Sequence, residues 1–449
     1  MASGHRARLP IHIVSAPLST ATDSYAPRSG DASYDVLSYD LDLTYRVRTN
    51  RLSGRARIHA VAHKPLAIVE FDLVGLRATK VRVDDASRVT FAHGQRSLRV
   101  TLPRTMAVGE KFSVDVEYAG APAPRRSRWG TIGWEELDDG AIVASQPTGA
   151  PTWFPCNDRP DNRATYRMAI TVDEGYAVAA SGKPVSMTKT GGRTRWEFAS
   201  DLPMATYLAA VHIGRYRESK IGERIRVVRP PALAAAASFA FSETPVMLDV
   251  FEHAFGPYPQ EACTIVVTAD ELEIPLEAQG LVVFGANHLA PDSHRLVAHE
   301  LAHQWFGNSV GIGHWRDIWL NEGFACYAEW LWAEASDRST IDRKAASHYA
   351  RLAELPQDLV LRDPGPELMF DDRVYKRGAL TLYALRYEIG DSRFDTLVRT
   401  WCERYRHALV ATDDFISLAE EISGRDLGEF FTRWLRDPAL PPLPASHGH

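Results

Sequence analysis

The chain has 449 residues, of which 45% are hydrophobic and 24% charged, so a disordered, collagenous or coiled-coil chain is excluded and two to three domains are expected. Its 51 basic and 57 acidic residues give a net charge of −6, which argues against a nucleic-acid-binding surface. Four scattered cysteines, none in a C-x-x-C pair, exclude a disulfide scaffold or a cysteine-rich zinc module and permit a reducing compartment.

The two ends of the chain are expected to lie outside the folded domains. Residues 1–33 are rich in Ser, Ala and Pro, and no run of apolar residues follows their basic ones, so we expect a disordered lead-in and no signal peptide. The longest nearly apolar run, 232–241, is about half of the roughly twenty residues that a membrane-spanning helix needs. Residues 441–449 are expected to form a tail. We therefore expect a cytoplasmic protein with no membrane or nucleic-acid partner.

The first half of the chain has the pattern of β-strands. Between residues 40 and 48, apolar side chains alternate with polar ones, which is typical of a strand with one buried face. The same alternation returns at 98–102 and 112–118, and glycines separate these runs. We predict a β-sheet-rich domain over residues 34–216.

The second half has helical spacing instead, with long segments rich in Ala and Leu. The candidate helices are 232–255, 293–306, 321–335, 374–389, 394–407 and 413–435, the last one broken at Gly424. We therefore predict a mostly helical domain over residues 217–440.

The strongest local signal is the pentapeptide His299-Glu-Leu-Ala-His303 on the predicted helix 293–306. Residues four apart lie on the same helix face, so both imidazoles can converge on one metal ion. Glu300, beside the first histidine, is placed to take a proton from a water molecule that the metal activates. The alternative is a helix that carries two histidines without a metal.

A third ligand is needed, because zinc hydrolases use three protein ligands and leave the fourth position to water or substrate. A third histidine in the extended motif is absent, since Ser309 stands in its place. Glu322 offers a carboxylate on the following helix, with eighteen residues between it and His303. Glu329, two turns further along the same face, is suited to orient a ligand imidazole, with an exposed helix carboxylate as the alternative.

These motifs resemble the zinc signature of the aminopeptidase N and leukotriene hydrolase family of zinc metallopeptidases (gluzincins). Further segments are similar to family signatures: WFPCND at 153–158, FGPYP at 255–259 and VYKRGA at 374–379. The matches run in the family's order over nearly the whole chain. The chain is thus identified as a short, two-domain, bacterial-type member, with an N-terminal β domain followed by a thermolysin-like, mostly helical zinc peptidase domain.

The resemblance implies a zinc-dependent aminopeptidase that hydrolyses N-terminal residues from peptides with a free N-terminus. It implies one Zn²⁺ per chain, on His299, His303 and Glu322, with Glu300 as the general base. Tyr375 resembles the family's tyrosine that donates a hydrogen bond to the developing oxyanion.

Glu277 and Gln146 resemble the residues that hold the substrate's free α-ammonium group. The family's Gly-x-Met-Glu-Asn segment reads Ile-Pro-Leu-Glu-Ala here, at 274–278, and Pro275 has no N–H to offer a substrate. A dipeptidase or an endopeptidase with an altered register is therefore an alternative. Phe370 stands where the leukotriene hydrolase branch has a second tyrosine, which argues against epoxide hydrolysis.

A non-catalytic scaffold of the same fold is an alternative from another class. Glu300 and Tyr375 argue against it, because neither is needed to hold zinc. The sequence leaves open the preferred first residue, the physiological substrate, the oligomeric state and the metal used in the cell.

Overall fold

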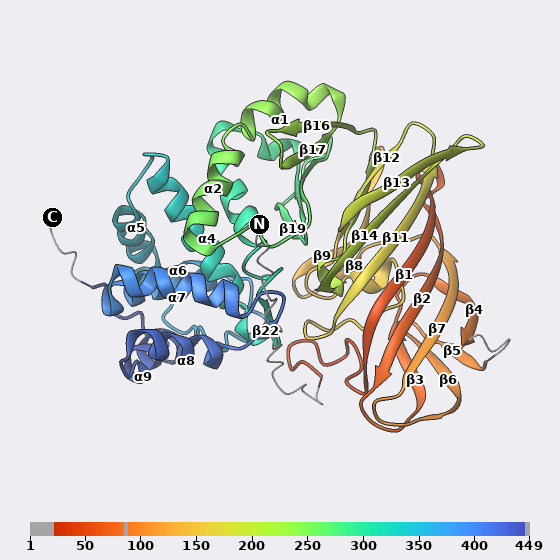
Figure 1. Cartoon of the computed structure of the whole chain (residues 1–449), viewed down its shortest axis with the longest axis horizontal. Coiled ribbons are helices and arrows are strands. Elements are labelled where there is room, and N and C mark those ends of the chain that lie inside the picture. Colours follow the sequence, from red (N-terminus) through yellow and green to blue (C-terminus); the bar gives the residue numbers. More distant parts are fainter. Residues whose placement is uncertain (1–21, 85–88, 445–449) are drawn as a thin grey trace, which may run out of the picture.

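A twisted seven-stranded sheet forms the body of the N-terminal half (Figure 1), in a computed structural model that describes residues 22–84 and 89–444. The strand order is β13-β14-β11-β1-β2-β7-β4, and only the β1–β11 pair is parallel. In β1, Leu41 and Leu43 are buried and Asp42 between them is exposed, so the predicted alternation is confirmed. The strands are β1 (Tyr34–Arg46), β2 (Arg51–Ala62), β4 (Arg77–Val83), β7 (Lys111–Gly120), β11 (Arg163–Asp173), β13 (Lys183–Thr190) and β14 (Arg193–Ala205).

Two smaller sheets complete this half. One has the order β3-β6-β5, with β3 (Leu66–Asp72), β5 (Phe91–His93) and β6 (Ser97–Met106). The other has the order β12-β15-β10-β9-β8, with β8 (Arg125–Ser127), β9 (Gly130–Leu137), β10 (Gly140–Ala144), β12 (Ala177–Ala180) and β15 (Val211–Gly214). Figure 1 shows β8 and β9 on the side of the β domain that faces the helices, so this sheet is placed to meet the second half.

A fourth sheet, which the sequence analysis missed, begins the second half. Its order is β16-β17-β18-β20-β19, with β17, β18 and β20 parallel and antiparallel strands at both edges. The strands are β16 (Arg217–Ile221), β17 (Ile225–Arg229), β18 (Cys263–Val267), β19 (Leu276–Ala278) and β20 (Leu281–Phe284). Every residue of β18 and β20 is buried, and such short, continuously apolar strands lack the alternation that separates a strand from a buried helix.

Helices make up most of the remaining chain, as predicted. The predicted helix 232–255 is interrupted at residues 241–243, and the predicted helix 293–306 already ends at Ala302. The break at Gly424 is confirmed, because that residue adopts the left-handed conformation with φ 66°. The helices are α1 (Ala234–Ala240), α2 (Thr244–Phe255), α3 (His294–Ala302), α4 (Trp319–Ala335), α5 (Ile341–Ala353), α6 (Asp372–Ile389), α7 (Asp391–Arg404), α8 (Thr412–Ser423) and α9 (Gly428–Phe431), and a two-stranded sheet pairs β21 (Gly311–Ile312) with β22 (Leu409–Val410). Helix α5 was not foreseen; its first turn is capped by Thr340, whose hydroxyl accepts from the backbone N–H of Arg343 at 3.2 Å.

The expected lead-in and tail lie largely outside the described residues. Residues 22–33, which we assigned to the disordered lead-in, pack against the folded chain instead: Asp23 and Tyr25 bond to the second half, and the backbones of Gly30 and Asp31 to Asp72 and Asn157 of the β domain. Asp23 accepts a hydrogen bond from the backbone N–H of Trp315 at 2.9 Å, and the hydroxyl of Tyr25 accepts one from the backbone of Gly365 at 2.7 Å. In the described part of the chain no single helix is long and apolar enough to span a membrane, although the bent pair Pro231–Ala240 and Thr244–Phe255 meets the criteria jointly by length and composition alone.

A small apolar cluster joins the two halves between the five-stranded sheets. Its members from the first half are Ile142, Ala179 and Ala210, and those from the second include Val228, Val266, Leu281 and Val283. His212 pairs with Ala179 across β15 and β12, so its side chain lies on the face that carries this cluster. The His212 side chain is fully buried, and neither ring nitrogen has a hydrogen-bond partner among the described residues.

Candidate active site

Three buried side-chain atoms converge where α3 ends and α4 begins. His299 Nε2 lies 3.4 Å from Glu322 Oε2, and His303 Nε2 lies 3.3 Å from the same oxygen. His303 follows the last residue of α3, but its backbone N–H still donates to His299 O at 3.2 Å, which keeps the helical spacing of the two rings. The structure therefore brings the three predicted metal ligands together within 4.8 Å of one another.

A contact between two glycines sets the distance between α4 and α6. A Cβ atom on Gly323 would lie only 2.8 Å from the Cα of Gly378, so the backbones of the two helices touch. Glu322 precedes the first glycine, and Tyr375 lies almost one turn before the second. The crossing brings Tyr375 to the metal ligands, and its ring stacks on that of His299 with centroids 5.8 Å apart and planes at 21°.

The other nitrogen of each imidazole is held by a hydrogen-bond acceptor. His299 Nδ1 donates to Glu329 Oε1 at 2.9 Å, and His303 Nδ1 donates to the backbone oxygen of Phe306 at 3.0 Å. These bonds keep a proton on each Nδ1, so in the neutral ring each Nε2 has the lone pair and faces Glu322. An acceptor on the far nitrogen of a ligand histidine is the usual arrangement in zinc sites.

Two cations flank Glu329, and the sequence analysis named neither of them. Arg295 Nη1 lies 3.6 Å from Glu329 Oε2. Lys376 is buried beside Cys326 and Asp372, and its charge acts on the Glu329 carboxylate without a direct ion pair. Burial alone would raise the pKa of Glu329, but the hydrogen bond from His299 and the charges of Lys376 and Arg295 lower it to about 2. Arg295 could have been found from its spacing, since it lies four residues before His299 on the same helix face.

Glu300 is buried beside the metal ligands, and its Oε2 has no hydrogen-bond partner among the described residues. Burial raises the pKa of this carboxyl to about 7, although the neighbouring histidines act in the opposite direction. An oxygen of Glu300 also lies within 4.8 Å of ligand atoms of Glu277 and His303. Such a carboxyl group can accept a proton and release it near neutral pH.

The charges of this cluster favour a bound cation. Burial would lower the pKa of His299, but hydrogen bonds to Glu322 and Glu329 outweigh it and raise the pKa to about 10. The pKa of His303 is raised to about 9 in the same way by Glu322 and Glu277. Four buried or half-buried carboxyl groups thus surround two imidazoles. Two imidazole nitrogens and one carboxylate oxygen form the donor set that zinc hydrolases use, so these residues fit a zinc ion.

A cleft of about 560 Å³ between the two halves contains all eight predicted site residues. Glu277 reaches it from β19, an edge strand of the fourth sheet, and Gln146 from the turn after β10. Ile274 and Leu276, which replace the Gly and Met of the family segment, line the same cleft, as do Pro275 and Phe370.

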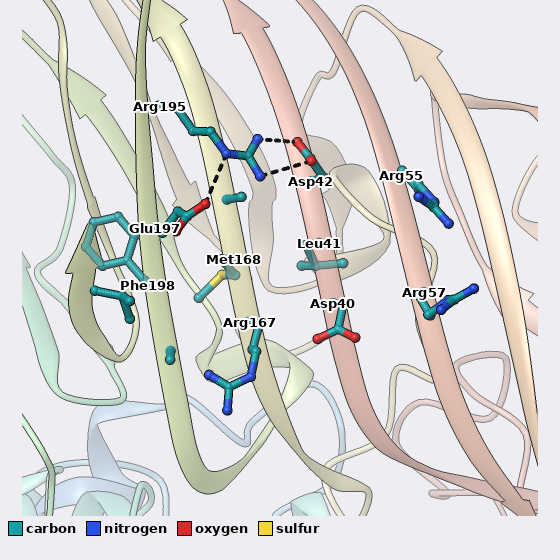
Figure 2. Close-up of a pocket in the computed structure, with 13 residues that line it drawn as sticks. Asp40, Leu41, Asp42, Arg55, Arg57, Arg167, Met168, Arg195, Glu197 and Phe198 are labelled. Carbon is teal, nitrogen blue, oxygen red and sulfur yellow. Dashed lines mark hydrogen bonds and ion pairs between the residues drawn. The ribbon is translucent and has the colours of Figure 1, made fainter. Parts of the chain in front are cut away.

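A second hollow of about 400 Å³ lies on the solvent-facing side of the seven-stranded sheet (Figure 2). Its charged side chains pair with one another: Arg195 donates to Asp42 at 2.9 Å and 3.1 Å and to Glu197 at 3.1 Å. None of the predicted site residues lines this hollow, and we assign it no catalytic role.

Comparisons with known proteins agree with this architecture. The sequence profile of the Peptidase family M1 domain matches residues 239–434, and that of the Peptidase M1 N-terminal domain matches residues 36–208. The M1 zinc metallopeptidase of Deinococcus radiodurans has a similar structure, with a TM-score of 0.86, 32% identity, and coverage of 94% of this chain and 99% of that one. A mutant of that enzyme was solved with a Tyr-Ser-Ala substrate. Yeast LTA4 hydrolase shares the fold, with a TM-score of 0.79, 20% identity, and coverage of 92% of this chain and 69% of that one.

The curated relatives are longer proteins. Glutamyl aminopeptidase of Bitis rhinoceros is 33% identical over 337 residues, which are 68% of this chain and 35% of that protein. Leucyl aminopeptidase of Saccharolobus solfataricus is 24% identical over 90% of this chain and 53% of its own length. The chain therefore spans between about a third and about half of the length of these two relatives.

Proposed function

Because the chain belongs to peptidase family M1, we propose that it is a zinc-dependent aminopeptidase that removes N-terminal residues from peptides. The observation that carries the proposal is the convergence of His299 Nε2, His303 Nε2 and Glu322 Oε2 beside the unpartnered carboxyl of Glu300. We assign the zinc to the first three residues and proton transfer to the fourth.

The side chains around the metal ligands have separate tasks. Zinc, when bound, polarises the substrate carbonyl and makes the attacking water more acidic. Glu300 accepts the proton of that water at Oε2 and later delivers it to the leaving amine. The hydroxyl of Tyr375, held over His299 by ring stacking, donates a hydrogen bond to the oxygen that gains negative charge. Glu329 keeps the His299 ring in its orientation.

The carboxylate of Glu277 anchors the free α-ammonium of the substrate, and Gln146 assists from the opposite wall of the cleft. Support for this assignment comes from the position of Glu277, whose carboxylate lies within 4.8 Å of ligand atoms of Glu300 and His303. A charge-assisted hydrogen bond in a desolvated cleft is stronger than one between neutral groups. The anchor therefore fixes the first peptide bond next to the proton-transfer residue.

A zinc peptidase with an altered register is the second candidate, because Pro275 lines the cleft without an N–H for a substrate backbone. A panel of aminoacyl anilides with N-acetylated counterparts, assayed with and without a chelator, separates the candidates. We expect chelator-sensitive release from free-amine substrates and little from acetylated ones. Equal cleavage of both would favour an endopeptidase, and activity in metal-free protein would refute the zinc peptidase.

The domain limits and the cellular location belong to the same proposal. We place the domain limits at residues 34–216 and 217–440, which limited proteolysis followed by mass spectrometry would test. A cytoplasmic location stays a prediction that fractionation of the producing cells would test.

A further inference from the structure

Glu135 is a half-buried carboxylate of the cleft that has no cation beside it among the described residues. Glu135 lies on β9 directly opposite Ile142 of β10, and both residues line the cleft. Its neighbour Trp134 points to the other face and is fully buried in the β domain. The Glu135 side chain is half-buried, yet within the described residues its carboxylate makes no hydrogen bond or ion pair. A half-buried charge without a partner is unfavourable unless something bound in the cleft supplies the partner.

The surroundings of Glu135 are acidic. Burial raises the pKa of its carboxyl, and the negative charge of Asp270 raises it further, while no cation of residues 22–84 or 89–444 acts in the opposite direction. Asp270 approaches from the second half of the chain, where its Oδ1 accepts a hydrogen bond from the backbone N–H of Asp138 at 3.2 Å. Glu271 and Glu273 follow on the same loop, line the cleft and are exposed. We call Glu135, Asp270, Glu271 and Glu273 the acidic wall of the cleft. In the described part of the chain, its carboxylates lack the flanking cations that Glu329 has in Arg295 and Lys376.

The acidic wall does not have the geometry of a metal site. Among the described residues, the groups whose ligand atoms lie within 4.8 Å of one another are both at the zinc centre, and neither includes Glu135 or Asp270. Carboxylates that are spread apart fit a larger organic cation, such as an ammonium or guanidinium group on a flexible stem.

The position of Glu135 relative to the amine anchor indicates which part of a substrate it meets. Ile142 and Ala144 line the cleft from the same strand, and Gln146 follows just beyond the strand's end. Glu135 is level with Ile142, and Ile142 lies two residues, or about 6.6 Å, before Ala144, the last residue of β10 before the turn that carries Gln146. A lysine or arginine side chain, built from bonds of about 1.5 Å, carries its charge roughly 6 Å from its Cα. A short side chain does not reach so far.

We propose that Glu135 selects peptides whose first residue is lysine or arginine, by pairing with the cationic end of that side chain while Glu277 and Gln146 hold the α-ammonium. The inference rests on the proposed aminopeptidase function and adds its substrate class. Asp270 strengthens the negative potential without being the direct partner. An N-terminal glutamate, by contrast, would place like charges together in this cleft.

The test compares substrates that differ only in charge. Arginine and citrulline have nearly the same shape, and only arginine is cationic. We expect kcat/KM for the arginine anilide to exceed that for the citrulline anilide by about 10- to 100-fold, the range of one hydrogen bond to a charged group. Glu135→Gln should bring this ratio close to one. Glu136→Gln is the matched control, because Glu136 lies on the opposite face of β9, where its Oε2 accepts from Asn50 Nδ2 at 2.9 Å. It should leave the ratio unchanged.

Calorimetric binding of argininamide and citrullinamide to the zinc-loaded protein separates Glu135 from turnover. Preference for argininamide that disappears in Glu135→Gln supports the inference, and absence of anilide cleavage in the same protein would refute only the aminopeptidase proposal. Equal affinity for the two amides in the wild type, or a preference that survives in Glu135→Gln, would overturn it. A shift of the preference to a glutamate anilide on addition of calcium would also overturn the inference, because the acidic wall would then be a metal site.

Discussion

Replacing Glu329 by glutamine should weaken zinc binding without moving the ligands. The side chain is 7% exposed, and its Oε1 accepts from His299 Nδ1 at 2.9 Å, a bond that the glutamine oxygen can keep at reduced strength. Loss of such an acceptor lowers metal affinity 10- to 100-fold, or about 1.4–2.7 kcal/mol. We expect a value near the upper end, because Arg295 and Lys376 remain in place and their charges, no longer balanced by Glu329, oppose the incoming cation.

The measurement is a competition titration with a chromophoric zinc chelator, which gives the dissociation constant directly. Glu354→Gln is the control, since that glutamate is exposed at the end of α5. Lys376→Met in the Glu329→Gln background should recover part of the lost affinity, because it removes one of the two cations that act on this position. A dissociation constant for Glu329→Gln within twofold of the wild type would refute the role that we assign to this carboxylate.

Four other substitutions test further assignments. Glu300→Gln should keep its zinc but lose about 10²–10⁴-fold in kcat, and Tyr375→Phe about 10²–10³-fold; full turnover with either would contradict the assigned roles. Glu277→Ala should reduce the discrimination against N-acetylated substrates, which we expect to be about 10- to 150-fold in the wild type, and an unchanged ratio would exclude it as the amine anchor. Burial lowers the pKa of His212 to about 3 from an ordinary 6.5, so its unfolded form takes up a proton first as the pH falls. The resulting contribution to stability is complete above pH 6.5 and is lost towards pH 3, by about 2 kcal/mol at pH 5. Urea unfolding of His212→Leu should show a weaker dependence on pH between 7 and 5, and an equally steep one would place the acid sensitivity elsewhere.

The sequence was most informative where function constrains spacing within one helix. His299 and His303 are four residues apart, and helical geometry alone predicts that they share a face. Helical geometry alone does not predict Glu322 as the third ligand. Eighteen residues separate it from His303, and the chain between them must bring the start of α4 back to the end of α3. The family resemblance supplied this part, and the structure has the three side chains in contact distance of one another.

Other features could not be predicted from a single sequence. Strand β18 is buried on both faces, so it has neither the alternation of a surface strand nor the length of a helix. The importance of Glu135 arises from the lack of a nearby cation among the described residues, and such a lack depends on every neighbour in space. In the sequence, Lys376 has the pattern of a solvated lysine on an amphipathic helix. Only the fold shows that it is buried beside Cys326 of α4, where the charge of Glu329 acts on it.

The glycine contact between α4 and α6 has a consequence for motion. Where two helices meet through side chains, rotamer changes can absorb small displacements, but Gly323 and Gly378 have no side chains to rotate. Glu322 and Tyr375 are therefore expected to move as one rigid unit. Any opening of the cleft during peptide entry or product release would change the distance between the two halves of the chain, while the spacing between the metal ligand and the tyrosine hydroxyl stays constant through the catalytic cycle.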